Sequence, residues 1–184
     1  MTAPAASTPV KRYHPALVTL HWLLAVLLSA ALGSGAGVLS KMPNTSPDKI
    51  PALRTHLIVG GLILVLTLLR LLARLMTAHP RPVSSGMAWA DRYAPMLHWA
   101  FYLAVLAMAA SGAGIALGAH LPEVVFGGVG HLPPDFGGMP ARTAHGVMSK
   151  LLAGLIVLHV AAALHHQWVL RDGLLARMWF GRRR

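Results

Sequence analysis

Four long apolar stretches constrain this chain more than any other feature of its sequence. Each is close to, or longer than, the roughly 20 residues that an α-helix needs to cross the roughly 30 Å hydrocarbon core of a bilayer. Hydrophobic residues make up 55% of the 184 positions, which is more than an ordinary soluble domain carries. The stretches cover residues 16–39, 53–75, 94–117 and 143–170. We therefore expect an all-α integral membrane protein that is a four-helix bundle surrounded by lipid.

The chain is predicted to consist of a short N-terminal segment and one transmembrane domain. Residues 1–12 are rich in Ala, Pro, Ser and Thr and are predicted to be a disordered N-terminus. Residues 13–184 form the predicted transmembrane domain. The connections over residues 40–52 and 118–141 are rich in Pro or Gly, so we expect both to be irregular.

Basic residues predict how the bundle lies in its membrane. The chain has 16 Lys and Arg against five Asp and Glu, but this charge flanks the apolar stretches instead of covering one soluble face, so we expect no nucleic-acid partner. Cytoplasmic loops carry the excess of Lys and Arg, which predicts that both termini are cytoplasmic. The terminal side holds Lys11, Arg12, Arg70, Arg74, Arg81, Arg92, Arg171, Arg177 and Arg182 to Arg184, and the opposite side holds Lys41, Lys49, Arg54, Arg142 and Lys150.

Histidines inside the apolar stretches are the strongest functional signal, because ionisable groups within a membrane are costly and are functional candidates by default. His145 and His159 lie fourteen residues apart, which on a helix gives a rise of about 21 Å and an angular offset of about 40°. They therefore share one helix face. Two imidazoles at this separation suit two haems, one toward each membrane surface, each with a second axial ligand from a neighbouring helix.

Depth and direction restrict those second ligands. His21 lies early in the first stretch, on the side where the fourth stretch carries His159, and His56 lies near the start of the second, level with His145. This predicts the pairs His21 with His159 and His56 with His145. Depth alone also permits His98 on the terminal side, and that alternative stays open.

Two other interpretations of these histidines compete with haem binding. A single membrane-embedded histidine is as readily a core residue bonded to the backbone or to a hydroxyl, but four at matched depths favour haem. Metal transport is disfavoured because the stretches offer neither carboxylate nor thiolate to join imidazole. The chain has no cysteine, which excludes disulfides, iron–sulfur clusters and covalent c-type haem. Any haem must be held by coordination and packing.

Several further residues are candidates for contacts with haem or quinone. Gly60, four residues after His56, would let a porphyrin edge or another helix approach. Arg70 and Arg74 suit the two haem propionates, although snorkelling arginines that set topology are the alternative. His166 lies seven residues beyond His159 on the same face, and it is a candidate for handling protons beside a quinone. His98 is a second such candidate.

Short motifs resemble the bacterial cytochrome b561 family over nearly the whole chain. They are H-W at His21, R-T-H-L-I-V-G from Arg54, R-L-L-A-R from Arg70, H-G from His145 and L-H-V-A-A-A-L-H-H from Leu158. The order of the spans is similar to that of the small dihaem members, in particular the superoxide oxidases. The resemblance implies transfer of electrons from superoxide, outside the bacterial inner membrane, through two haems b to ubiquinone. It also implies axial ligands at His21, His56, His145 and His159.

Two functions follow as hypotheses. The first is a superoxide:ubiquinone oxidoreductase, which would use a positive surface near the external haem to attract a small anion; Lys49, Arg54 and Arg142 are the steering candidates. The alternative is a cytochrome b subunit that links a periplasmic dehydrogenase or hydrogenase to quinone. Such a subunit needs an exposed docking patch, for which the stretch over residues 132–139 is the candidate.

Overall fold

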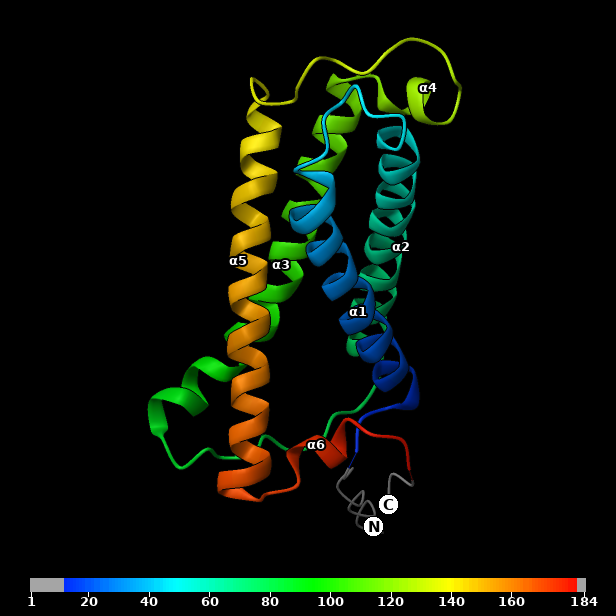
Figure 1. Cartoon of the computed structure of the whole chain (residues 1–184). Coiled ribbons are helices and arrows are strands. Elements are labelled where there is room, and N and C mark those ends of the chain that lie inside the picture. Colours follow the sequence, from blue (N-terminus) through cyan, green and yellow to red (C-terminus); the bar gives the residue numbers. More distant parts are fainter. Residues whose placement is uncertain (1–11, 182–184) are drawn as a thin grey trace, which may run out of the picture.

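Four long helices dominate the computed structural model, which describes residues 12–181 apart from the side chains of residues 89 and 90 (Figure 1). All four are long and apolar enough to cross a membrane, and no strand occurs within the described range. The prediction of an all-α protein with four spans is confirmed. The helices are α1 (Pro15–Ser34) with its π-helical extension η1 (Gly35–Leu39), α2 (Lys49–Met76), α3 (Ala88–Gly118), and α5 (Pro140–His165) with its π-helical extension η2 (His166–Leu170).

Two ends of the bundle can be distinguished. The first and last described residues lie together at one end, which we name the terminal end, and the short helix α4 (Leu121–Val125) lies at the other, the α4 end (Figure 1). The predicted N-terminal segment falls almost entirely on residues outside the described range. Another short helix, α6 (Leu174–Arg177), follows η2 at the terminal end.

The predicted irregular connections contain more helix than expected. The connection over residues 118–141 includes α4, because Leu121 and Val125 are buried against Leu53 of α2 and Ala116 of α3. Helix α2 also begins at Lys49, inside the connection predicted as irregular over residues 40–52. Proline is tolerated in the first helical turn, where an N–H has no intrahelical partner, so prolines near the start of α2 do not prevent it.

The helices pack as two pairs, α1 with α2 and α3 with α5, while α2 also contacts α3. Among the described residues, neither α1 nor α2 packs extensively against α5. The pairs converge on a buried apolar layer at mid-height, made of Leu24, Ile63, Ala104, Val105 and Leu152. Leu152 is completely buried and lies seven residues from both histidines of interest on α5. This layer separates the two levels at which histidines occur.

Contacts at the terminal end bring the last described residues under the start of α1. The Trp22 indole donates to the carbonyl of Met178 at 2.9 Å, and Arg12 donates to the carbonyl of Phe180 at 3.2 Å. On the opposite helix pair, the first turns of α3 point away from the rest of that helix (Figure 1), and Pro95 lies inside α3. A proline removes one helical hydrogen bond and bends the helix.

Candidate haem sites

Two pairs of histidines face each other between the helix pairs. The ring centroids of His21 and His159 are 6.0 Å apart, and those of His56 and His145 are 6.2 Å apart. A metal–imidazole bond is about 2 Å long, so two opposed rings that share one metal lie about 6 Å apart. The structure therefore brings together the pairs expected from depth, at a separation that suits a shared iron; their ligation stays a prediction.

His145 is held in one tautomer at the α4-end site. Its Nδ1 lies 3.2 Å from the carbonyl oxygen of Met108 and 3.1 Å from the Oγ of Ser111, whose own proton goes to that carbonyl at 2.9 Å. A carbonyl only accepts, so Nδ1 carries the hydrogen and Nε2 keeps its lone pair. Such second contacts orient metal-binding histidines, and Nε2 is thereby available to iron.

Glycines give the α4-end histidines room. A Cβ built on Gly35 of η1 would lie 3.4 Å from Cε1 of His56, and one built on Gly112 of α3 would lie 3.3 Å from Cε1 of His145. A cavity of about 360 Å³ opens beside His56 between α1 and α2. At Gly60 an added Cβ would meet no atom within 4 Å, so this glycine does not serve close helix packing. Space next to Gly60 is what a porphyrin edge requires.

The terminal-end site holds three histidines. His98 of α3 has its ring centroid 6.3 Å from that of His159, nearly the same separation as His21. Its Nδ1 lies 3.2 Å from the carbonyl of Ala94, so by the same argument its Nε2 is bare. Phe101, three residues after His98 on α3, has its ring centroid 5.4 Å from that of His159. Geometry therefore keeps both His21 and His98 as partners for His159.

Arg70 supplies an unbalanced positive charge beside this site. Its Nη1 donates to the Tyr102 hydroxyl at 2.5 Å, and its guanidinium lies 5.5 Å from the ring centroid of Tyr102. Within residues 12–181 the one ion pair is formed elsewhere, by His166 and Asp172, so no carboxylate neutralises Arg70 or Arg74. A half-buried guanidinium in a membrane helix needs an anion. Haem propionates would provide it, so the residues present fit the cofactor.

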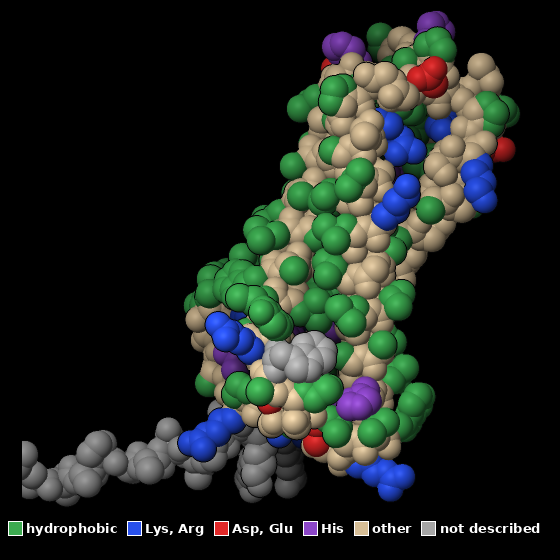
Figure 2. All heavy atoms as spheres, turned by 90° about the vertical axis from the view of Figure 1, so that its left-hand side faces the viewer, with side chains coloured by type: hydrophobic (Ala, Val, Ile, Leu, Met, Phe, Trp, Pro, Cys, Tyr) green, Lys and Arg blue, Asp and Glu red, His purple; other side chains and the backbone are tan. Residues whose placement is uncertain are grey.

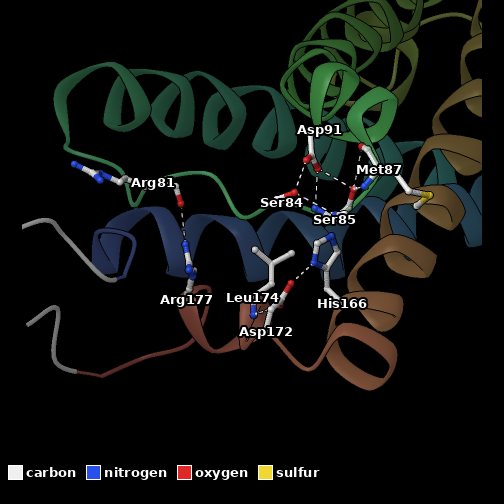
Figure 3. Close-up of polar contacts among 10 residues, drawn as sticks. Arg81, Ser84, Ser85, Met87, Asp91, His166, Asp172, Leu174 and Arg177 are labelled. Carbon is white, nitrogen blue, oxygen red and sulfur yellow. Dashed lines mark hydrogen bonds and ion pairs between the residues drawn. The ribbon is translucent and has the colours of Figure 1, made fainter.

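His166, at the start of η2, forms a hydrogen-bonded pair with Asp172 (Figure 3). Nδ1 of His166 lies 2.5 Å from Oδ2 of Asp172, and the side chains are 14% and 18% exposed. Arg171 and Gly173 adopt left-handed backbone conformations, with φ of 52° and 72°, which turn the carboxylate back toward the imidazole. The amide of Leu174 donates to Oδ1 of Asp172 at 2.9 Å.

The charge state of Asp172 follows from these contacts. Burial raises the pKa of its carboxyl, but the hydrogen bonds from His166 and the Leu174 amide outweigh burial and leave the pKa below its ordinary value. Asp172 is therefore ionised at neutral pH. A second polar cluster lies beside the pair, in which Asp91 accepts hydrogen bonds from Ser84 and Ser85 at 2.6–2.8 Å (Figure 3).

Comparison with known proteins identifies the family of this chain. Residues 12–181 match the family described as prokaryotic cytochrome b561. This chain belongs to that family. The protein named cytochrome b562 in Cereibacter sphaeroides is 30% identical over 165 residues, which cover 88% of this chain and 90% of that protein. The resemblance predicted from the motifs is confirmed, and the chain is a multi-pass membrane cytochrome of the b type that takes part in electron transfer.

The basic residues of this b561 protein at the α4 end lie in different settings. Arg54 is exposed and donates from Nε and Nη2 to the carbonyl of Val125, at 3.0 and 2.6 Å, which ties α2 to α4. Arg142 is half-buried at the start of α5 and acts electrostatically on His145. Figure 2 shows basic side chains near the α4 end as well as at the terminal end.

A residue that attracts superoxide by its charge should be exposed to solvent, but Lys49 is buried. It is 4% exposed, and its Nζ donates to the carbonyls of Leu39 and Met42 at 2.9 and 2.7 Å. These are carbonyls at and beyond the end of η1, which have no helical partner of their own. Lys49 therefore closes the first span, which leaves Arg54 and Arg142 as the steering candidates.

Sequence reasoning missed Tyr102, Ser111 and Asp172. Asp172 carried a usable signal, since it is the only acid after Asp135 and follows the proton-handling candidate His166 by six residues. Ser111 and Tyr102 carried none, because a hydroxyl on a long apolar helix shows its partner only when the neighbouring helix is placed.

Proposed function

We propose that this b561 cytochrome binds two haems b, one between His56 and His145 and one between His21 and His159. It thereby connects the two faces of the bacterial inner membrane, with both termini in the cytoplasm. The observation that carries this proposal is the repetition of a histidine pair at two levels of α5, about 21 Å apart by helical rise, with an apolar layer between them. Bound haem supplies a one-electron carrier at each level.

The apolar layer defines what can pass between the two levels. Leu24, Ile63 and Leu152 are among its members, each less than 10% exposed, and packed hydrocarbon of this kind offers water and protons no path. Protons consumed at one face must therefore come from that face. The layer keeps the chemistry of donor and acceptor apart while the electron crosses.

Superoxide is the donor that the charge at the α4 end supports best. Arg54 and Arg142 place positive charge at the periplasmic side of the His56–His145 site, and a field of this sign raises the local concentration of a small anion. The resemblance to superoxide oxidases agrees with this substrate. His56 and His145 would both hold the haem iron, so superoxide would give its electron at the periphery of the site.

Ubiquinone is the proposed acceptor at the terminal end. Reduction of a quinone to a quinol takes up two protons, so its site needs groups that deliver them. His166 holds a proton on Nδ1 against the ionised Asp172, follows His159 by seven residues at the start of η2, and is 14% exposed, so water at the cytoplasmic face can reach it. The bare Nε2 of His98 is the second proton-handling candidate.

The alternative function is a cytochrome b subunit that receives electrons from a periplasmic dehydrogenase or hydrogenase. The predicted docking stretch over residues 132–139 is partly folded into the molecule, because Leu132 and Phe136 pack against the core cluster near α4. Phe126 and Val129 are instead exposed at 54% and 69%. A cavity of about 710 Å³ opens at the same end. These features keep a protein donor as the second hypothesis.

Stopped-flow reduction of the purified cytochrome by superoxide tests the first function. We expect fast haem reduction that slows as salt shortens the screening length to about 10 Å at 0.1 M. Arg142→Glu should slow reduction about tenfold or more, while Arg92→Glu, an exposed charge at the terminal end, should not. Reduction that is slow and indifferent to both salt and Arg142→Glu would favour the protein-donor hypothesis.

A further inference from the structure

Thr67 and Arg70 of α2 and Tyr102 of α3 form a polar cluster in which not every hydrogen-bonding group has a partner. Thr67 is 3% exposed and Tyr102 is 5% exposed, and Arg70 follows Thr67 by three residues, so the two are neighbours on the surface of α2. Arg70 joins this group to α3 through its hydrogen bond to the Tyr102 hydroxyl, 2.5 Å long. All three residues lie on the terminal side of the apolar layer.

The hydroxyl of Thr67 has no hydrogen-bond partner among the described residues. Threonines elsewhere in α2 and at its end behave differently: Thr55 donates to the carbonyl of Pro51 at 3.1 Å, and Thr77 donates to that of Ala73 at 2.7 Å. Both use the carbonyl four residues earlier, the usual solution for a hydroxyl on a helix. Burying a hydroxyl without a hydrogen-bond partner costs free energy. We therefore expect Thr67 to donate to an acceptor that is not part of the polypeptide.

Tyr102 and Arg70 also have donors to spare. The Tyr102 oxygen accepts from Arg70, so its own proton is not used in that bond, and no acceptor for it occurs in the described part of the chain. Arg70 uses one of its five N–H groups in the hydrogen bond to Tyr102. No carboxylate among residues 12–181 lies within ion-pair distance of it. A guanidinium that is bonded to the Tyr102 hydroxyl, with the Thr67 hydroxyl one helical turn away, can serve as a receptor for a carboxylate, to which charge-assisted hydrogen bonds are strongest.

We propose that Thr67, Arg70 and Tyr102 bind one carboxylate, a propionate of the haem held at the terminal end. This rests on the proposed haem between His21 and His159. Arg70 acts electrostatically on both of those histidines, so the receptor and the haem site share one neighbourhood. Burial of Thr67 and Tyr102 disfavours a lipid carboxylate, which would approach from the bilayer. Thr67 and Tyr102 are thus positioning residues for the cofactor.

The two hydroxyls have a consequence that can be measured. By donating to an ionised propionate they withdraw part of its negative charge, and a less negative surrounding favours the reduced state of a nearby iron. Removing one hydroxyl should therefore lower the reduction potential of the terminal-end haem and weaken its retention. The haem at the α4 end, on the far side of the apolar layer, should not respond.

Redox titration of the purified full-length protein tests the proposal, with Tyr102→Phe and Thr67→Val as near-isosteric variants. At the wild-type midpoint potential, the ratio of reduced to oxidised terminal-end haem should fall about threefold or more in each variant. Matched controls are Tyr93→Phe, an exposed tyrosine of the same helix, and Thr55→Val, whose hydroxyl already has a backbone partner. If Tyr102→Phe does not accumulate in the membrane, the redox titration of Thr67→Val alone tests the proposal.

Haem with esterified propionates identifies the source of the carboxylate. Replacement of haem b by its dimethyl ester should lower occupancy at the terminal end in the wild type and should make wild type and Tyr102→Phe alike. A difference that persists with the ester would mean that another carboxylate, such as a fatty acid, occupies the receptor, and would overturn the assignment. Unchanged potentials and haem content in both variants would overturn the receptor itself. A wild-type protein without a b-type haem spectrum would instead overturn the proposed function.

Discussion

The two histidine sites use the same helix but differ in what surrounds them. At the α4 end, His145 faces His56 and is fixed from behind by Ser111 and the Met108 carbonyl. At the terminal end, His159 faces two histidines, and Arg70 lies nearby. One helix face thus presents a histidine to a facing histidine at two levels, while the neighbouring helices decide which site carries charge.

That difference suits two different tasks. The α4-end site is lined by glycines and a serine, and its charges lie farther out on Arg54 and Arg142, on the side from which the proposed donor would arrive. The terminal-end site is charged from within, and the His166–Asp172 pair lies beyond it. An acceptor that takes up protons with its electrons needs such groups close at hand, whereas a donor of electrons alone does not.

Removal of an α5 histidine gives the largest expected effect. His145→Ala should eliminate the α4-end haem and His159→Ala the terminal-end haem, because each loses the one ligand that only α5 supplies. Haem content by pyridine haemochrome should fall from two to one per chain in either variant. A wild-type content of one haem would contradict the pairing at two levels.

The crowded terminal end allows a sharper test of ligand identity. His21→Ala should remove the terminal-end haem, whereas His98→Ala should keep it and leave the optical spectrum of both haems close to wild type. The two variants form their own control, since both rings lie about equally far from His159. If His98→Ala loses the haem and His21→Ala does not, α3 supplies the ligand.

A smaller effect is expected at the glycine beside the α4-end site. Gly60→Ala should weaken binding of that haem about tenfold, because the added methyl group would occupy the space assigned to the porphyrin edge. Gly61→Ala is the matched control, since a Cβ there also meets no atom within 4 Å but points about 100° away around the helix. Haem loss during purification, followed by absorbance, measures the difference. Equal retention in the two variants would contradict the contact at Gly60.

The smallest effect concerns Asp172 and appears in the pH dependence of stability. Because its folded-state pKa lies below the ordinary value of about 3.9, the carboxylate stabilises the fold above about pH 4. That contribution disappears as pH falls through the lower, folded-state pKa. Asp172→Asn should therefore lower the thermal midpoint by a few degrees at pH 7 and by less near pH 3. If the difference in thermal midpoint between wild type and Asp172→Asn does not narrow on acidification, the ionised carboxylate contributes nothing to the stability of the fold.

Sequence alone determined the spans and the shared face of His145 and His159. Length and hydropathy decide whether a segment crosses a bilayer, and helical periodicity decides which of its residues share a face; both are local properties. The pairing of His21 with His159 and of His56 with His145 also followed, because span direction fixes depth. What periodicity could not show was the rotation of one helix relative to another, so His98 remained an alternative.

Only the tertiary structure decided the surroundings of these histidines. The contact of Tyr102 with Arg70 and that of Ser111 with His145 depend on how neighbouring helices are rotated, which no single helix encodes. Lys49 turned inward because the end of the first span left carbonyls without partners, and charge patterning alone placed it outside. Asp172 reached His166 through left-handed turns at Arg171 and Gly173, a reversal set by backbone geometry that hydropathy does not report.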